Sequence, residues 1–447
     1  MKGYKDNSLL LQEKLVASTG VTTDSRKVRP GEMFFALKGE RFDGNEFAEA
    51  VVASGALCAV VDRESAVGEK VYSGELDSDK FIVVEDSLAA MQKLAKWHRL
   101  RFDIPVIGLT GTNGKTTTKE LVNAVLSTKF STVATIGNLN NHIGVPLTLF
   151  RINDDTQCAV IEMGASHPGE IALLAEIARP THGLITNVGK AHLEGFGSFE
   201  GVCRTKGELY DFLWKSGGTA FYNVDNLYLR EMIQQRVGMV TVKYGKELEG
   251  WRISKTDTRR LYLSARNGWK RVHTQLIGGY NIDNVLAALC VGIRMGIPFT
   301  TAARAISGYV PSNSRSQLKD TGRNTLILDT YNANPTSMRT SVENFAKTAF
   351  RHKVLILGDM LELGSESASE HRAIVELASG IGAEQVFFVG AEFSGCRDAA
   401  CHSDKVSFFH SAEKLASYLK NGHPLSGMTI FIKGSNGMHL SSLEQLF

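Results

Sequence analysis

The segment V106-I-G-L-T-G-T-N-G-K-T-T-T-K119 constrains the fold of this chain more than any other. Its apolar run predicts a buried strand, a glycine-rich turn follows, and a helix is expected to begin near Lys115 and Thr116. Such a turn points successive backbone N–H groups at one place, where the helix N-terminus adds positive potential. Lys115 would neutralise phosphate charge there, and the Thr116 hydroxyl would ligate Mg²⁺. The segment therefore predicts a nucleoside-triphosphate site.

One position departs from the usual phosphate-loop pattern. The strict pattern has glycine five residues before Gly114, where this chain has Leu109. Gly108 and Gly111 flank the gap, so the loop is a variant. A plain glycine turn between a strand and a helix remains the alternative interpretation.

Length and charge exclude several classes of protein. A chain of 447 residues predicts two or three domains. Fifty basic against 47 acidic residues leave a formal charge of +3 without a polybasic block, which gives no electrostatic case for nucleic acid or a membrane surface. No apolar run reaches the length of a membrane span, and the N-terminus lacks a signal-peptide core. The six cysteines are scattered, and the spacing of Cys396 and Cys401 fits no zinc pattern, so we expect a reducing cytoplasm.

Three blocks emerge along the chain, which we place at residues 1–88, 89–312 and 313–447. The first holds short strand-like runs, and a helix is expected over 87–100 with Ser87 as its N-cap. The middle block alternates strands and helices, which predicts a doubly wound parallel sheet with ligands at the carboxyl ends of its strands. The third block alternates in the same way and predicts a second, smaller α/β unit.

Several polar residues follow predicted strands. Glu162 ends the run C158-A-V-I-E162 and suits Mg²⁺, with a solvent-facing glutamate as the alternative. His192 lies in a glycine-rich loop, where a metal or phosphate contact and a structural role are equally plausible. The run from Asp329 to Pro335 either closes over the nucleotide or simply begins a helix. Lys206, taken alone, looks like a solvated lysine on a helix face.

Taken together, these segments resemble the Mur ligases over essentially the whole chain. The motifs that carry the resemblance are TDSR from Thr23, TGTNGKTTT from Thr110, GNLNNHIGVP from Gly137, EMGASHPG from Glu162, TNVGKAHLEG from Thr186, TKGEL from Thr205, YNIDN from Tyr280, DTYNANP from Asp329, LGDMLELG from Leu357 and KGSNG from Lys433. The loop variant with Leu109 is the form that this family uses.

The resemblance implies three α/β domains: an N-terminal UDP-binding domain, a central ATP-binding domain with a P-loop ATPase-type sheet, and a Rossmann-like C-terminal ligase domain. It implies an ATP-dependent amide ligase that works through an acyl phosphate. The EMGASHPGEI and YNANPTSM runs favour the member that joins D-alanyl-D-alanine to UDP-N-acetylmuramoyl tripeptide in peptidoglycan precursor synthesis. We then expect a cytoplasmic monomer that uses ATP and two Mg²⁺ ions, without nucleic acid or membrane insertion.

The resemblance also implies roles for matching residues. Catalytic roles are expected for Lys115, His192 and Lys206. Metal ligands are expected at Thr116, Glu162, His192 and Lys206, the last as a carbamate that offers Mg²⁺ an anionic oxygen. Nucleotide contacts are expected from Gly111, Thr112, Asn113, Gly114, Lys115, Thr116, Thr117, Asn281, Asn284, Arg315, Asp329 and Asn332. Contacts to the UDP-muramoyl peptide are expected from Ser25, Arg26, Lys38, Gly39, Asn138, Asn140 and Asn141.

Three alternatives stay open at this point. Two are sister ligases, namely the enzyme that adds the third peptide residue and folylpolyglutamate synthetase. The third is a nucleotide-dependent switch or binding module without ligase chemistry. Against the switch, N223-V-D-N226 lacks the lysine of the guanine-binding Asn-Lys-x-Asp motif. The sequence does not distinguish meso-diaminopimelate from lysine at the third peptide position.

Overall fold

The computed structural model describes residues 7–253, 260–265, 270–312, 315–400 and 404–447. The chain divides into two compact units. One takes in residues up to 108 together with 130–164 and 172–182, and the other takes in 109–129, 165–171 and everything from 183 onward. Cys401 lies outside the described residues, and the five described cysteines are free thiols.

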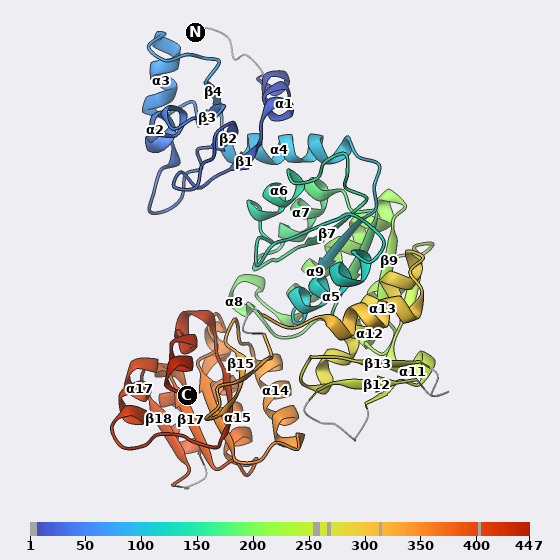
Figure 1. Ribbon diagram of the computed structural model, residues 1–447, viewed down its shortest axis with the longest axis vertical. Coiled ribbons are helices and arrows are strands. Elements are labelled where there is room, and N and C mark those ends of the chain that lie inside the picture. The colour runs from blue at the N-terminus through green and yellow to red at the C-terminus, as the bar shows by residue number, and fades with distance from the viewer. Residues whose placement is uncertain (1–6, 254–259, 266–269, 313–314, 401–403) are drawn as a thin grey trace. The chain divides into compact units, whose positions relative to one another are not determined.

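The N-terminal segment forms a four-stranded parallel sheet in the order β1-β2-β3-β4 (Figure 1). Its strands are β1 (Gly20–Thr22), β2 (Glu32–Phe35), β3 (Cys58–Asp62) and β4 (Phe81–Val84). Its helices are α1 (Ser8–Ala17), α2 (Ala48–Ala53), α3 (Ala66–Ser73) and α4 (Ser87–Leu100). The short strand-like runs expected in the first block are confirmed as β2, β3 and β4.

Side chains that alternate along these strands build two cores, one on each face of the sheet. Phe35, Val60 and Ile82 pack with residues of α1 and α4, whereas Phe34 and Val61 pack with residues of α2 and α3. Because successive side chains of a strand point to opposite faces, apolar runs such as these are buried on both sides. The sequence period thus determines a three-layer α/β/α arrangement.

The prediction that Ser87 caps α4 is wrong. The helix begins at Ser87 itself, and the preceding Asp86 is the N-cap, whose carboxylate accepts the Ala89 N–H at 2.8 Å. Ser87 instead donates its backbone N–H (2.7 Å) and its hydroxyl to the Asp62 carboxylate. Asp and Ser are comparable N-caps, so the sequence alone could not choose between neighbours.

The central sheet has six strands in the order β10-β9-β8-β5-β7-β6. They are β5 (Val106–Thr110), β6 (Thr132–Ala134), β7 (Cys158–Glu162), β8 (His182–Ile185), β9 (Thr219–Asn223) and β10 (Val240–Tyr244). The intervening helices are α5 (Lys115–Leu126), α6 (Gly144–Leu149), α7 (Glu170–Ala178), α8 (Leu193–Phe196), α9 (Phe199–Ser216), α10 (Leu227–Gln234) and α11 (Lys246–Glu249). The alternation of strands and helices is as expected from the sequence.

A small antiparallel sheet follows, which the sequence did not predict. It comprises β11 (Arg252–Ile253), β12 (Tyr262–Ser264) and β13 (Arg271–His273). A 3₁₀ turn (Gly279–Asn281) then leads into α12 (Ile282–Arg294), and α13 (Phe299–Gly308) comes next. Each strand of the small sheet has two or three residues, which is too short for a clear period.

The C-terminal sheet has the order β14-β15-β19-β16-β17-β18, and only its edge strand β14 is antiparallel to its neighbour. The strands are β14 (Gln317–Asp320), β15 (Thr325–Asp329), β16 (Lys353–Gly358), β17 (Gln385–Val389), β18 (Val406–Phe409) and β19 (Thr429–Lys433). Helices α14 (Pro335–Lys347) and α15 (Ser367–Ser379) pack on one face, and α17 (Ala412–Lys420) packs on the other. A short helix, α16 (Ala391–Ser394), follows β17.

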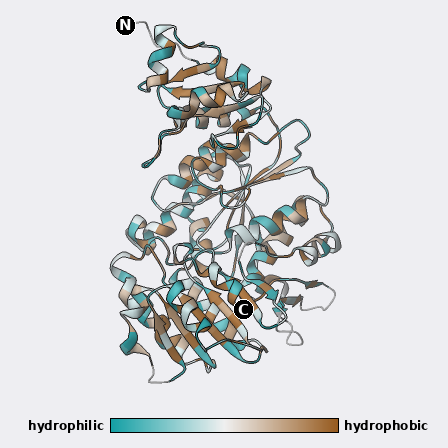
Figure 2. Ribbon diagram, turned by 60° about the vertical axis from the view of Figure 1, so that its left-hand side comes forward, coloured by the Kyte–Doolittle hydropathy of each residue, from teal (hydrophilic) through white to brown (hydrophobic). Residues whose placement is uncertain are grey.

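The distribution of hydropathy fits this layering. Figure 2 shows hydrophobic colours on the strands of the C-terminal sheet and hydrophilic colours on the outer helices and loops. Within the described part of the chain, no helix combines the length and apolar character that crossing a bilayer requires.

Candidate active site

The loop between β5 and α5 has the geometry of a phosphate-binding loop. Gly111 and Gly114 have φ angles of 142° and 77°, and Gly114 is the N-cap of α5. A Cβ on Gly111 would lie 2.0 Å from Oγ1 of Thr186, and one on Gly114 would lie 2.6 Å from Oδ1 of Asn284. Both positions therefore require glycine, for backbone conformation and for space.

Leu109 belongs to the strand rather than to the loop. It lies inside β5, and its side chain is fully buried. The tight turn begins only at Gly111, after the strand has ended at Thr110. The absent glycine thus leaves the loop intact, and the predicted strand–loop–helix unit is confirmed.

Asn187 holds the loop in shape, a role that the sequence did not indicate. Its backbone carbonyl accepts the Thr112 N–H at 2.9 Å, and its side-chain oxygen accepts the Asn113 N–H at 3.0 Å. Its amide nitrogen donates to the Asn113 carbonyl at 3.0 Å, and the Thr186 hydroxyl donates to the same carbonyl at 2.7 Å. The only signal was the run from Thr186, in which we singled out His192 alone.

Lys115 lies over the loop that precedes it. Its Nζ donates to the carbonyl oxygens of Gly111 at 2.8 Å and Thr112 at 3.1 Å. Its charge also lowers the pKa values of His192 and Lys206, so the three groups lie within electrostatic reach of one another. A cation held there by weak neutral acceptors is suited to a phosphate, which would bind it more strongly.

Lys206 is buried, so the prediction from composition of a solvated lysine is wrong. It lies on α9 with 2% of its surface exposed. Its Nζ donates to the Ala165 carbonyl at 3.3 Å and lies 5.1 Å from the centre of the Phe196 ring. Burial, reinforced by the charge of Lys115, lowers its pKa to about 7, against the weaker pull of two glutamates. About half of the amine is therefore neutral at pH 7.

His192 lies at the N-cap of α8 in the left-handed region, with φ of 49°. Its Nδ1 pairs with the carboxylate of Glu362, and its ring meets Phe196 edge-on at 6.2 Å between centroids. Burial lowers its pKa, the Glu362 carboxylate opposes this, and the charges of Lys115 and Lys206 add to the lowering. The structure thus joins His192 to a residue of the C-terminal segment.

The remaining expected metal ligands are buried oxygen donors. Thr116, in the first turn of α5, is 2% exposed, and Glu162, at the end of β7, is 1% exposed. Glu162 accepts the Asn140 side-chain amide at 2.8 Å, and its backbone N–H donates to Oγ1 of Thr135 at 3.0 Å. Hydroxyl and carboxylate oxygens suit Mg²⁺. Among the described residues, no three His, Cys, Asp or Glu side chains form a ready metal site, so phosphate and carbamate oxygens would have to complete one.

The two asparagines expected near adenine support α12. The Asn284 amide donates to Oδ1 of Asn281 at 2.8 Å, and the Asn281 amide donates to the Ile277 carbonyl at 2.8 Å. Oδ1 of Asn284 accepts the Thr118 hydroxyl at 3.0 Å, which ties α12 to α5. Their contact with adenine stays a prediction.

Asn334 begins a helix, as one of the two interpretations of the loop after β15 predicted, and it also contacts the phosphate loop. It is the N-cap of α14, and its Oδ1 accepts the Ser337 N–H at 2.9 Å. Its Nδ2 donates to Oδ1 of Asn113 in the phosphate loop at 2.8 Å. Helix capping alone explains an asparagine before Pro335, so the sequence does not mark Asn334 as a site residue.

The other residues expected from the C-terminal segment gather at the ends of β15 and β19. Arg315 stacks its guanidinium 3.6 Å from the centre of the Tyr331 ring. Asp329 accepts the buried Lys433 Nζ at 2.6 Å, and the Asn332 carbonyl accepts the same group at 3.3 Å. Lys433, which we had not selected, thus neutralises Asp329 and orders the loop.

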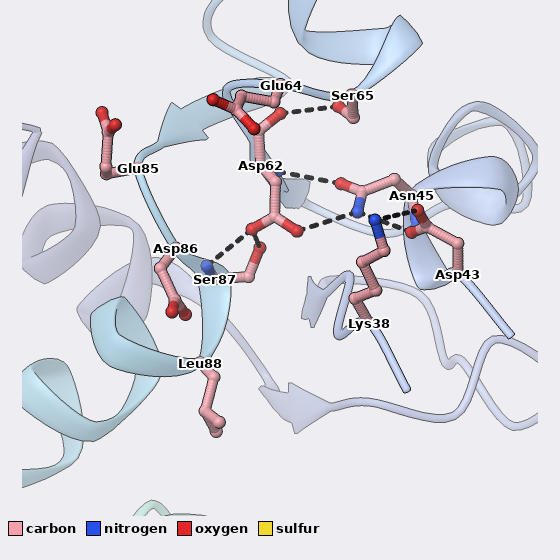
Figure 3. Close-up of a pocket in the computed structure, with 10 residues that line it drawn as sticks. All are labelled: Lys38, Asp43, Asn45, Asp62, Glu64, Ser65, Glu85, Asp86, Ser87 and Leu88. Atoms are coloured by element: carbon pink, nitrogen blue, oxygen red, sulfur yellow. Dashed lines mark hydrogen bonds and ion pairs between the residues drawn. The ribbon is translucent and has the colours of Figure 1, made fainter. Parts of the chain in front are cut away.

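Of the four predicted UDP contacts, the structure places one in a cavity. The N-terminal segment contains a cavity of about 280 Å³. Figure 3 shows its lining side chains, with Lys38 beside Asp43. Its lining residues are Lys38, Asp43, Asn45, Asp62, Glu64, Ser65, Glu85, Asp86, Ser87 and Leu88. Ser25, Arg26 and Gly39 do not line it. The lining is mainly acidic, so this cavity by itself is poorly suited to a diphosphate.

The remaining UDP contacts have local roles. Arg26 is exposed and forms a fork-like pair with Asp24, with N···O distances of 2.8 and 2.9 Å that hold the pKa of Asp24 well below its usual range. Gly39 forms a turn in which its N–H donates to the Phe42 carbonyl at 2.9 Å. Ser25 is partly buried beside Arg26. Their contact with a UDP group stays a prediction.

The three asparagines expected at the muramyl-peptide end occupy one turn. Asn140 holds Glu162 as described above, and its N–H donates to the Asn138 carbonyl at 2.7 Å. Asn141 accepts the N–H of Gly144 at 2.9 Å, at the start of α6. Asn138 and Asn141 are exposed. These bonds shape the turn and leave the predicted peptide contact untested.

Comparison with protein families matches nearly the whole chain in three parts. Residues 18–99 match the Mur ligase family catalytic domain, residues 109–292 the Mur ligase middle domain, and residues 314–436 the Mur ligase glutamate ligase domain.

Individual relatives and solved structures point to the same family. The chain is 34% identical over 435 residues to the UDP-N-acetylmuramoyl-tripeptide–D-alanyl-D-alanine ligase of Bacillus subtilis, covering 95% of this chain and 92% of the relative. A crystal structure of MurF from Acinetobacter baumannii superimposes with a TM-score of 0.84 at 28% identity, covering 98% of this chain and 97% of that one. The MurF ligase of Thermotoga maritima, crystallised with ADP, gives 0.82 at 28% identity, with 99% and 98% covered.

Proposed function

Because the chain belongs to the Mur ligase family, we propose that it joins D-alanyl-D-alanine to UDP-N-acetylmuramoyl tripeptide at the expense of ATP. The observation that carries this proposal is the 34% identity to the Bacillus subtilis ligase of that specificity, across 95% of this chain. The MurF ligase that was crystallised with ADP supports ATP as the nucleotide substrate. We place the reaction in the cytoplasm and assign it to a monomer, and the free cysteines fit that compartment.

The first step makes an acyl phosphate. The terminal carboxylate of the tripeptide attacks the γ-phosphorus of ATP, a new P–O bond forms, and the bond to the β-phosphate oxygen breaks to release ADP. Lys115 leaves its loop carbonyls and pairs with the phosphate oxygens. The N-terminus of α5 adds positive potential at the same place. Placement and charge neutralisation account for most catalysis of phosphoryl transfer.

Lys206 enters this chemistry as a carbamate. Its neutral amine forms an N–C bond to CO₂ and loses one proton to solvent, which gives a carbamate anion. The charge of Lys115 disfavours the ammonium form of Lys206, and for the same reason it favours the anion. Thr116, Glu162, His192 and the carbamate would hold Mg²⁺, which supplies neutralisation of phosphate charge when bound.

The second step forms the amide. The free amine of D-alanyl-D-alanine attacks the acyl carbon and forms a C–N bond. The tetrahedral intermediate collapses as the C–O bond to phosphate breaks, and the released phosphate takes up the proton that the nitrogen loses, which leaves the amide. The acyl phosphate must be kept from water in the interval. The contact between Asn334 and Asn113 supports a role for the C-terminal segment in covering the phosphate loop during this interval.

A substrate panel tests the proposed function. Purified protein is given ATP and Mg²⁺ with or without each substrate, and phosphate release is followed. We expect efficient release only when UDP-muramoyl tripeptide and D-alanyl-D-alanine are both present. Two tripeptides, with meso-diaminopimelate or lysine in the third position, identify the natural one. Equal turnover with ATP alone refutes the ligase, and acceptance of a free amino acid by a UDP-dipeptide identifies the sister enzyme instead.

A further inference from the structure

We infer that Glu362 is a positioning residue for His192. Its carboxylate accepts the hydrogen on Nδ1 of the His192 ring and so leaves Nε2 as the nitrogen with a free electron pair. The inference rests on the proposed function, in which His192 is a ligand to Mg²⁺. It goes beyond that function because it assigns a role to Glu362, a residue of the C-terminal segment, in preparing the site.

The His192 ring is held from two directions. Glu362 pairs with Nδ1, and the ring of Phe196 lies edge-on at 6.2 Å. The backbone of His192 is in the left-handed region, with φ of 49°, where residues other than glycine are uncommon. Strained conformations of this kind persist where the surrounding structure enforces them, and they concentrate at functional sites.

Glu362 is strained in the same way, with φ of 63°. The three residues before it are each anchored. The Asp359 carboxylate accepts the N–H groups of Glu392 (3.0 Å) and Phe393 (2.9 Å), the Met360 N–H donates to Nε2 of His371 (3.0 Å), and the Leu361 N–H donates to the Ser435 hydroxyl (3.0 Å). These hydrogen bonds fix the backbone that precedes Glu362 and so place its carboxylate next to His192.

The pairing suits a metal-binding histidine. A ligand histidine commonly donates its other ring N–H to a carboxylate, which fixes the tautomer, orients the ring and raises the basicity of the ligating nitrogen. A carboxylate only accepts, so the hydrogen must lie on Nδ1. Because Glu362 follows β16 and His192 follows β8, this arrangement couples His192 to the position of the C-terminal sheet.

A neighbouring ion pair provides a matched control. Lys190 pairs with Glu370 at 2.8 Å and with Glu366 at 3.4 Å, which links the same two loop regions without touching the His192 ring. Glu370→Gln weakens that link and leaves Glu362 in place. Glu362→Gly removes the carboxylate and also relieves the left-handed strain, so this variant is expected to fold at least as well as the wild type.

The ring tautomer gives the first readout. In ¹⁵N NMR spectra of the full chain labelled on histidine, at pH 8 and without metal, we expect His192 to carry its hydrogen on Nδ1. Glu362→Gly is expected to move it to Nε2, and Glu370→Gln is expected to leave it on Nδ1. A wild-type ring with its hydrogen on Nε2, or an unchanged tautomer in Glu362→Gly, overturns the inference.

Metal affinity gives the second readout and needs no turnover. Binding of Mn²⁺ in the presence of ADP, followed by electron paramagnetic resonance, is expected to weaken 10- to 100-fold in Glu362→Gly, the usual effect of removing such a carboxylate. Equal weakening in Glu370→Gln would overturn the inference, because it would show that loss of any ion pair between these two segments weakens metal binding. Failure of the proposed ligase function appears separately, as absent phosphate release by the wild type.

Discussion

Lys206 should react with CO₂ near neutral pH, because the structure lowers its pKa and so raises the fraction of neutral amine. With its pKa at about 7, about three-quarters of the amine is neutral at pH 7.5. A lysine at the ordinary value of 10.5 would be neutral in only about 0.1% of molecules at that pH. Only the neutral amine has the electron pair that bonds to CO₂, so burial raises the reactive fraction several hundredfold.

The assay supplies ¹³C-labelled bicarbonate and follows the carbamate carbon by NMR from pH 5.5 to 8.5. Carbamate formation at fixed dissolved CO₂ should rise steeply through pH 7, as the amine loses its proton, and the apparent rate should level off above about pH 8. Lys206→Met, of similar length but without the amine, identifies the signal. Phosphate release measured on the same samples should rise and fall with carbamate content.

Two results would refute this reasoning. One is a wild-type spectrum in which every carbamate signal is also present in the spectrum of Lys206→Met. The other is an apparent rate of carbamate formation that still rises tenfold per pH unit at pH 8.5, which would mean that burial and the charge of Lys115 do not lower the pKa of Lys206. A Lys206→Ala variant adds a functional check, because short carboxylic acids such as acetate should partly restore its activity by replacing the carbamate oxygens.

Further changes test the packing and the loop. Lys206→Met should raise the free energy of unfolding by about 4–5 kcal/mol below pH 7 in CO₂-free buffer, because the pKa of Lys206 is lower in the folded chain than in the unfolded one. The gain should vanish by about pH 10.5, where the amine is neutral in both states. A gain that does not depend on pH would contradict the lowered pKa. Gly111→Ala should weaken ADP binding at least about tenfold in calorimetry, whereas Gly308→Ala, with nothing within 4 Å of its Cβ, should not. Lys433→Met should destabilise the C-terminal sheet by about 3 kcal/mol in hydrogen exchange, because it leaves a carboxylate with 15% exposure unpaired. Asp62→Ala should cost about 1–3 kcal/mol in urea denaturation, since it frees donors at the start of α4.

Much of the fold could be predicted from local patterns. The apolar runs beginning at Val106 and Cys158 form the strands β5 and β7, because short apolar runs bounded by polar turns are typical of strands buried in a parallel sheet. The errors are of two kinds. The cap of α4 differs by one residue, since neighbouring Asp86 and Ser87 are equally good caps. The other kind is missed strands: β1, β6, β10, β14 and β18 lie at sheet edges and are only partly buried, and the antiparallel strands β11–β13 are too short to show a period.

In the candidate site, too, the residues that are contiguous in sequence could be predicted, and contacts between distant residues could not. The phosphate loop was predicted in full because its strand, glycines and lysine are contiguous in sequence. Asn187, Asn334 and Glu362 were not selected, because each is remote in sequence from the residue that it contacts. Each lies in a motif that carries the family resemblance, but a polar residue after a strand has too many ordinary explanations to be selected on that ground. The proposed domain limits, the roles of the site residues and all substrate contacts stay predictions.

The sequence by itself determined that this chain has a strand, a glycine loop and a helix built to receive a triphosphate, because those residues are adjacent and act through their own backbone. Only the tertiary structure decided the burial and the pKa of Lys206. Nothing next to it in sequence distinguishes it from a solvated lysine, yet it is 2% exposed and its pKa falls to about 7. Burial and the charge of Lys115 both act through space, from elements that only folding brings near.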